Sequence, residues 1–275
     1  MNESSRLWKD MLGRTLYRAV AMATLAFVLA PLVVVVWASF FSNKILSFPP
    51  QGYTTDWFIR AWQQDVFRQG FLLSLQLGVM ATLWSLLLGV PAALALARYS
   101  FPGREAINAI LMAPMMVPGI VAGAAVYIFF IEVEMRTEIP LVGSLPGLSI
   151  AHVLIGLPWT VRLVTASMVG VDRQIEEAAL SLGANPLVTF FKVTLPLVRP
   201  GIVAGAMFSF IVSFIDLEKS LFLVGPGRVT LPIAIVNYLE WNLDSTIAAV
   251  ATMQILVIAA ALLVSDRYFK LSRSF

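Results

Sequence analysis

Three ionisable side chains interrupt one of the long apolar runs of this chain. Asp216, Glu218 and Lys219 fall within four residues of each other. Ionisable residues at membrane depth are costly, and where they occur they commonly mark a transport pathway. At roughly 100° per residue along a helix, Asp216, Lys219 and Ser220 share one side, which predicts that Glu218 points elsewhere. A pathway aspartate would attract an ammonium group, and the lysine would neutralise it or meet a substrate anion.

Two structural interpretations stay open beside the pathway. Asp216 and Lys219 could pair with each other, or the apolar run could end near Phe214, so that both lie at the outer interface and reach toward water. Arg162 lies in another apolar run, where a buried cation would need a partner such as Asp216. Tyr238 is a further candidate, either as a contact for an external protein or as an interfacial anchor.

The composition offers little for catalysis. The chain of 275 residues has no cysteine and one histidine, His152, which we interpret as structural. Because paired carboxylates at ligand spacing are also missing, we predict no metal site and no catalytic residue. A Gly-x4-Gly-Lys-Ser/Thr phosphate loop does not occur in the sequence, so the chain is not expected to bind or hydrolyse ATP itself. These features disfavour a membrane-embedded enzyme.

Hydropathy patterning predicts an all-α membrane protein. Of the residues, 59% are hydrophobic and 13% charged, against about 25% charged in soluble domains. A span needs about 20 apolar residues, and six runs meet this: 19–41, 69–97, 106–131, 148–171, 201–223 and 245–265. We interpret the first run as a retained span, because the apolar part of a cleaved signal peptide has only about 7–15 residues.

The distribution of positive charge predicts the orientation. Lys and Arg concentrate in cytoplasmic loops. Twelve of the nineteen fall on one side of the predicted spans, and these are Arg6, Lys9, Arg14, Arg18, Arg98, Arg104, Arg173, Lys192, Arg199, Arg267, Lys270 and Arg273. Both termini are therefore expected in the cytoplasm. The chain then divides into a cytoplasmic segment 1–18, a six-helix domain 19–265 and a cytoplasmic tail 266–275, with the loop 172–200 also cytoplasmic.

This cytoplasmic loop has a helix–turn–helix pattern. Glu176 stands in the first turn of a predicted helix, where an acidic residue is favourable. Gly183 and Asn185-Pro186 predict the end of that helix. A second amphipathic piece, 187–193, is expected to end near the dipeptide at 195–196. The whole would form a short helix lying across the membrane surface, with a face that suits a partner's groove.

The loop carries a motif of known type. The run Glu177-Ala178-Ala179, then Gly183, then Val193-x-Leu195-Pro196 resembles the EAA loop of permease subunits in binding-protein-dependent ABC importers, with Val193 where the family usually has Ile. The resemblance implies the type I ABC importer permease fold, and it implies that this loop docks on a cytoplasmic ATPase. The coupling residues that it implies are Glu177, Ala178, Ala179, Gly183, Leu195 and Pro196.

The resemblance narrows the substrate class. Residues 223–227, 230–232 and 247–250 are similar to the spermidine/putrescine branch, which includes relatives for opines, phosphonates and 4-aminobutyrate. That branch usually has an acidic pair after Ser-Phe, whereas here Ile215-Asp216 follows, and Lys219 replaces a small or apolar residue. We therefore expect a small amino compound with a carboxylate or phosphonate, such as an amino acid or opine; the alternative is a polyamine. The predicted pathway residues are Asp216, Lys219, Ser220, Arg162 and Tyr238.

The resemblance also implies the partners. They are an ABC ATPase dimer that binds ATP and magnesium, a second permease subunit that is a paralogue, and a periplasmic or extracellular substrate-binding protein. The chain itself is expected to hold no cofactor and no nucleic acid, and to lie in the lipid bilayer of a bacterial inner (cytoplasmic) membrane. The implied mechanism is alternating access. A secondary transporter or channel is compatible with six spans, but leaves the EAA-like motif unexplained.

Overall fold

The computed structural model describes residues 3–45 and 47–269. In these two ranges all regular structure is helical, apart from two isolated bridges, Phe41 with Tyr53 and Gly225 with Arg228. Five helices are long and apolar enough to cross a membrane, and a sixth span results if a bent pair of helices counts as one. The predicted all-α membrane class is therefore confirmed. The chain divides into two compact units, which are described separately.

The first unit comprises residues 1–63 and 241–255. It contains α1 (Glu3–Ala38), α2 (Asp56–Gln63) and the first part of α12 (Thr246–Phe269). The most apolar stretch of α1 has no buried residue, which suits a helix surrounded by lipid. This helix begins before the predicted span 19–41 and ends at Ala38, three residues earlier than expected.

A small aromatic and apolar core holds the first unit together. Ala38, Phe41 and Ala248 are buried in one cluster. The indole Nε1 of Trp57 donates a hydrogen bond of 2.6 Å to the carbonyl of Phe41. The guanidinium of Arg60 lies 4.8 Å from the centre of the Trp57 ring, as in a cation–π contact. The end of α1 is thus tied to α2 through backbone and ring contacts.

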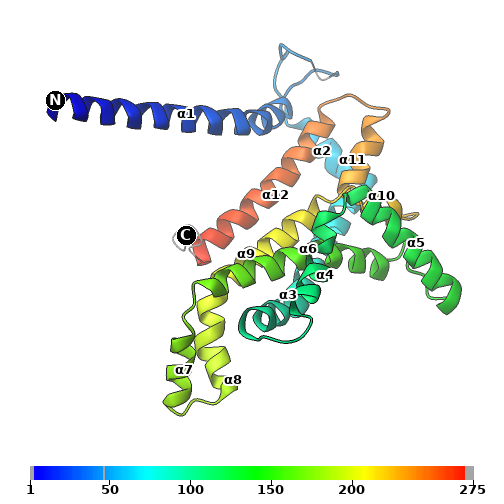
Figure 1. Ribbon diagram of the computed structural model, residues 1–275. Helices are drawn as coiled ribbons and strands as arrows, with labels where there is room; N and C mark the ends of the chain where they lie inside the picture. Colours follow the sequence, from blue (N-terminus) through cyan, green and yellow to red (C-terminus); the bar gives the residue numbers. More distant parts are fainter. Residues whose placement is uncertain (1–2, 46, 270–275) are drawn as a thin grey trace. The chain divides into compact units, whose positions relative to one another are not determined.

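The second unit comprises residues 64–240 and 256–275. Besides the second part of α12, its helices are α3 (Asp65–Arg98), α4 (Arg104–Met116), α5 (Gly119–Thr137), α6 (Leu145–Val169), α7 (Arg173–Ser181), α8 (Pro186–Thr189), α9 (Leu195–Phe214), α10 (Ser220–Leu223) and α11 (Leu231–Leu239). Helices α3, α6 and α9 pack against one another along their length and form its centre (Figure 1).

Small residues bring α6 and α9 close together. A Cβ on Gly205 would lie 3.1 Å from the Cα of Thr160, so the two backbones nearly touch. Ser209 and Thr160 share a hydrogen bond of 2.9 Å between their hydroxyls, and Ser209 lies 2.8 Å from the carbonyl of Gly156. Small residues and interhelical hydrogen bonds are the usual means by which helices associate in a membrane.

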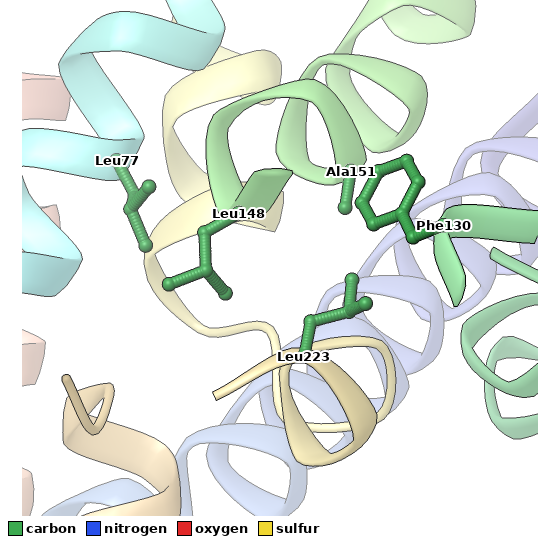
Figure 2. Close-up of a cluster of buried hydrophobic side chains, with 5 residues drawn as sticks. All are labelled: Leu77, Phe130, Leu148, Ala151 and Leu223. Atoms are coloured by element: carbon green, nitrogen blue, oxygen red, sulfur yellow. The ribbon is translucent and has the colours of Figure 1, made fainter. Parts of the chain in front are cut away.

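A buried apolar cluster joins the shorter helices to this centre (Figure 2). Leu77 comes from α3, Phe130 from α5, Leu148 and Ala151 from α6, and Leu223 from α10; each is almost completely buried. Because α10 directly follows the charged segment at 216–219, this cluster fixes one end of that segment.

The predicted third span, 106–131, is not one straight helix. It is broken into α4 and α5, whose axes differ by 110°. The break lies at Val117-Pro118. A residue before proline avoids the helical region, and Val117 is extended with φ −85° and ψ 133°. α5 then starts at Gly119.

The predicted fifth span, 201–223, is wrong in its length. Helix α9 ends at Phe214, as the alternative interpretation allowed, and residues 215–219 are turn and irregular structure before α10. The Asp216 carboxylate accepts a hydrogen bond of 2.9 Å from the amide of Ser220. A short polar side chain that bonds nearby amides offers the backbone an alternative to the helix, which is the physical reason for the interruption.

The second piece of the polar loop does not end near Leu195-Pro196. α8 passes through a π-helical turn, Phe190–Thr194, directly into α9, so Pro186–Phe214 is one helical stretch. Pro196 has no amide to donate, and in the preceding turn the Leu195 amide bonds to the carbonyl of Phe190, five residues back. The loop is therefore joined rigidly to a predicted span.

The predicted terminal segments are only partly described. Residues 1 and 2 of the segment 1–18, and residues 270–275 of the tail 266–275, including Lys270 and Arg273, lie outside the described residues. The cytoplasmic location of both termini stays a prediction.

Candidate functional site

Local capping makes the α7–α8 loop a stiff element. Asp172 accepts a hydrogen bond of 2.9 Å from the amide of Gln174 and caps the start of α7. Gly183 has φ +90°, and its amide and that of Ala184 bond back to the helix. This is the Schellman arrangement, which favours glycine because a side chain is strained there. Asn185 then caps α8, because its side-chain oxygen accepts a hydrogen bond of 2.8 Å from the amide of Val188.

The motif residues of α7 lie on an open surface. Glu177 is 62% exposed and pairs at 3.4 Å with Arg173, which is 69% exposed. Ala178 is exposed and Ala179 half-buried. Large apolar side chains are exposed on the same loop, namely Ile175, Leu180, Leu182, Leu187 and Phe191. An exposed apolar surface rimmed by charge is typical of a protein interaction site.

The neighbouring acidic residue points inward instead. Glu176 Oε1 lies 3.1 Å from a guanidinium nitrogen of Arg98 at the end of α3, and it accepts a 2.7 Å hydrogen bond from Thr194 in the π turn. The side chains of Arg98 and Glu176 are only 18% and 16% exposed. Arg98 also approaches the carbonyl of Val171 at 3.5 Å. We call this contact of Arg98, Glu176 and Thr194 the loop clamp; it joins α7 to the end of α3 and to the π turn that precedes α9.

The last two motif residues lie apart from the α7 surface. Leu195 and Pro196 form the first turn of α9, beyond the π turn; Leu195 is half-buried and Pro196 exposed. They belong to the junction between the loop and the span rather than to the exposed end of the loop.

The charged segment lines a cavity of about 530 Å³ at the break between α4 and α5. Asp216, Glu218 and Lys219 are its charged lining residues; apolar side chains such as Met115 and the ring of Trp159 form much of the rest. Trp159 is held by stacking on Phe208, with ring centres 5.0 Å apart. Concave sites with an apolar lining and a few placed polar groups are the usual form of small-molecule sites.

Asp216 and Lys219 pair with each other, as one of the structural interpretations expected. The Lys219 ammonium lies 3.7 Å from the Asp216 carboxylate. That carboxylate also accepts hydrogen bonds of 2.9 and 3.0 Å from the amide and the hydroxyl of Ser220. The predicted grouping of these three residues is therefore found, although it arises from a turn and not from a helix face.

His152 extends this network into the centre of the second unit. Its Nε2 lies 3.1 Å from the Ser220 hydroxyl, and its Nδ1 lies 2.7 Å from the hydroxyl of Ser213 in the last turn of α9. The imidazole is almost fully buried. It therefore connects α6, the end of α9 and the start of α10, which agrees with a structural role.

Two other predicted pathway residues lie elsewhere. Arg162 is exposed rather than buried, and it lines a separate cavity with Asn108 and Met112; the expectation that Asp216 is its partner is wrong. The reason is that Asp216 lies beyond the end of α9, where it forms an ion pair with Lys219. Tyr238 packs on Phe67 at 5.0 Å and is not among the lining residues of the cavity at Asp216.

The expectation that Glu218 points away from Asp216 is wrong. Both line the same cavity, because residues 215–219 are not helical and helical periodicity does not apply to them. The loop clamp was also missed from the sequence. In the sequence, Glu176 is recognisable only as an acid in the first turn of a helix, and no local pattern indicates a partner 78 residues away. For His152 the sequence signal was its position in an apolar span.

Fold and site together define a class. The chain is an all-helical membrane protein with five or six spans, a capped loop with an exposed motif, and a charged cavity beside a broken helix. Its fold matches that of a bacterial alginate ABC transporter solved in complex with a periplasmic protein bound to an alginate pentasaccharide. The TM-score is 0.72, with 16% sequence identity, over 95% of this chain and 96% of that one. This likeness shows the fold of the type I importer permeases.

Residues 85–273 match the family described as binding-protein-dependent transport system inner membrane component. The chain belongs to this family, and it is therefore an inner-membrane permease subunit of an ABC importer and not itself the ATPase.

Two curated relatives from Escherichia coli (strain K12) cover most of the chain. The putrescine transport system permease protein PotI is 30% identical over 82% of this chain and 81% of its own length. The spermidine/putrescine transport system permease protein PotC is 30% identical over 94% of this chain and 97% of its own length.

Proposed function

We propose that this chain forms half of a translocation pathway for a polyamine or a similar small amine. The single observation that carries the substrate class is the ion pair between Lys219 and Asp216 at 3.7 Å. From the sequence alone, Lys219 disfavours a polycationic substrate, because its ammonium would repel the ammonium groups of the substrate. Because the Asp216 carboxylate neutralises this ammonium in the cavity wall, Lys219 no longer argues against a polycationic substrate. The names of PotI and PotC agree with the same class.

The expectation of a carboxylate- or phosphonate-bearing amino compound is less well supported. It requires that Lys219 bind an anionic group of the substrate, but the Lys219 ammonium is already paired with the Asp216 carboxylate. Transport of an amino acid or an opine would therefore contradict the proposal.

The exposed surface of α7 is the proposed docking site for the ATPase. Glu177, Ala178 and the exposed Leu182 stand on the open side of a loop that both caps keep in shape. Gly183 supports the turn behind this surface. Leu195 and Pro196 take the more indirect part of joining the loop to α9.

The loop clamp supplies a route for the motion. Closure of two ATPases on ATP would shift α7, and the clamp passes that shift to α3 and to the π turn below α9. The second permease subunit would complete the pathway, and the external binding protein would deliver the substrate. In this scheme the chain holds no nucleotide itself.

Uptake by the reconstituted complex tests the proposal. The complex of both permeases and the ATPase is placed in vesicles with ATP inside and with the binding protein outside. Radiolabelled putrescine, spermidine, 4-aminobutyrate and a phosphonate are offered in turn. We expect ATP-dependent uptake of putrescine or spermidine. Uptake of 4-aminobutyrate or the phosphonate alone would refute the polyamine class.

The docking proposal has its own test. Glu177→Ala should reduce the stimulation of ATP hydrolysis by the loaded binding protein, because the changed side chain lies on the proposed contact surface. Glu105→Gln, an exposed acid at the start of α4, serves as the control. If Glu177→Ala and the control behave alike, the ATPase docks elsewhere.

A further inference from the structure

The cavity beside the broken helix presents two carboxylates in different situations. Asp216 is 9% exposed and is engaged by the Lys219 ammonium and by the amide and hydroxyl of Ser220. Its charge is thereby balanced and its oxygen sites are largely used. A second cation could bind this group only by displacing these contacts.

Glu218 stands in the opposite situation. Its side chain is exposed to the cavity, and within residues 3–45 and 47–269 no group forms a hydrogen bond or ion pair with its carboxylate. Because this side chain is exposed, water solvates the carboxylate, and a cation that enters the cavity can replace that water without breaking a contact within the described residues. Glu218 is thus the acid in this cavity that remains open to a ligand.

The backbone around Glu218 is built to receive its side chain. The carboxylate lies over Gly119, the first residue of α5, where any Cβ would overlap it. One turn later, Gly123 allows the backbone of Glu218 and Lys219 to approach; a Cβ there would lie 2.9 Å from the carbonyl of Glu218. These two close approaches hold the acid at the break between α4 and α5.

The charges of the cavity add up to one negative charge at Glu218. Asp216 and Lys219 cancel, and the remaining charged lining residue is Glu218. An ammonium is a strongly hydrated cation that binds well to a carboxylate with an aromatic ring nearby, and Trp159 lines the same cavity. This combination suits the end of an amine and offers no free cation for a substrate carboxylate.

We propose that Glu218 is the carboxylate that contacts an ammonium group of the substrate, and that Asp216 is a positioning residue that holds Lys219 and the start of α10. This assignment rests on the proposed function, since it presupposes an amine substrate. It reverses the roles that helical periodicity suggested for the two acids.

Transport by the full complex tests this assignment. Variants Glu218→Gln, Glu218→Asp and Glu105→Gln are reconstituted with the ATPase, the second permease and saturating loaded binding protein. Uptake of radiolabelled putrescine and spermidine and the stimulated ATP hydrolysis are measured together. We expect Glu218→Gln to lower uptake per ATP by about tenfold, the scale of one lost hydrogen bond to a charged group. Stimulated hydrolysis should stay within about twofold, since docking is unchanged.

The two other variants make the result specific. Glu218→Asp keeps the charge and should recover most of the uptake, and Glu105→Gln should match the wild type. Wild-type uptake by Glu218→Gln would overturn the assignment. So would a loss of stimulated hydrolysis in both Glu218 variants, which would show a purely structural residue. If the wild-type complex imports neither amine, the proposed function fails instead, so the two failures are distinguishable.

Discussion

The loop clamp makes a quantitative prediction. Arg98 and Glu176 are 78 residues apart in sequence and meet at 3.1 Å, with less than a fifth of either side chain exposed. We consider a double-mutant cycle in which Arg98→Ala, Glu176→Ala and the combined variant are compared with the wild type. The cycle isolates the energy of this contact from the other effects of each substitution.

The structure sets the expected size of the coupling energy. A hydrogen bond to a charged group contributes about 1.5–3 kcal/mol, and removing one partner of a buried pair costs about 3–5 kcal/mol because the other charge is left alone. The clamp is not fully buried, and the carbonyl of Val171 at 3.5 Å still partly serves Arg98 when Glu176 is removed. We therefore expect a coupling energy of about 2 kcal/mol.

The same loop contains a matched control. Arg173 and Glu177 form an ion pair of 3.4 Å one turn apart, but 69% and 62% of their side chains are exposed. Exposed pairs at this spacing are worth about 0.3–0.5 kcal/mol, since water screens the charges. The cycle Arg173→Ala with Glu177→Ala should therefore give a coupling energy of no more than about 0.5 kcal/mol.

The assay is unfolding of the permease subunit by SDS titration in mixed micelles, which reports the free energy of unfolding for each variant. If the changes in unfolding free energy of Arg98→Ala and Glu176→Ala sum to that of the double variant within about 0.5 kcal/mol, as they do for independent sites, the reasoning is refuted. In the assembled transporter, Glu176→Ala should lower uptake more than it lowers ATP hydrolysis, because the ATPase still docks while α3 and α9 follow it less.

Three further predictions concern the backbone and the buried network. Gly183→Ala should cost about 1 kcal/mol in the same titration, because φ +90° is strained for alanine, although no atom would clash there. Gly205→Leu should cost about 3 kcal/mol, since α6 and α9 must part, whereas Gly13→Leu, with open space around it, should stay within about 0.5 kcal/mol. His152→Ala should cost about 3 kcal/mol, as it leaves a void and withdraws the partner of the Ser213 hydroxyl; a cost below that of Gly183→Ala would show that the imidazole bonds are unimportant.

Much of the fold follows from the sequence because membrane spans and helix caps depend on neighbouring residues. Length and hydropathy indicated the spans, and Gly183 and Asn185-Pro186 correctly predicted the turn between α7 and α8. The Val117-Pro118 break also has a local cause, the restriction that proline places on the residue before it. The mean hydropathy of 106–131 does not register this break, since an average over a window carries no information on the direction of the backbone.

The roles of the charged residues were decided by tertiary structure. The sequence by itself determined which ionisable groups lie in apolar surroundings, since that depends on composition along the chain. Which of them are paired depends on where α9 ends and on which helices meet. Asp216 was found with Lys219 and not with Arg162, and Glu176 was found with Arg98 in α3. Electrostatic energies change steeply over a few ångströms, and such distances between distant segments exist only once the chain has packed.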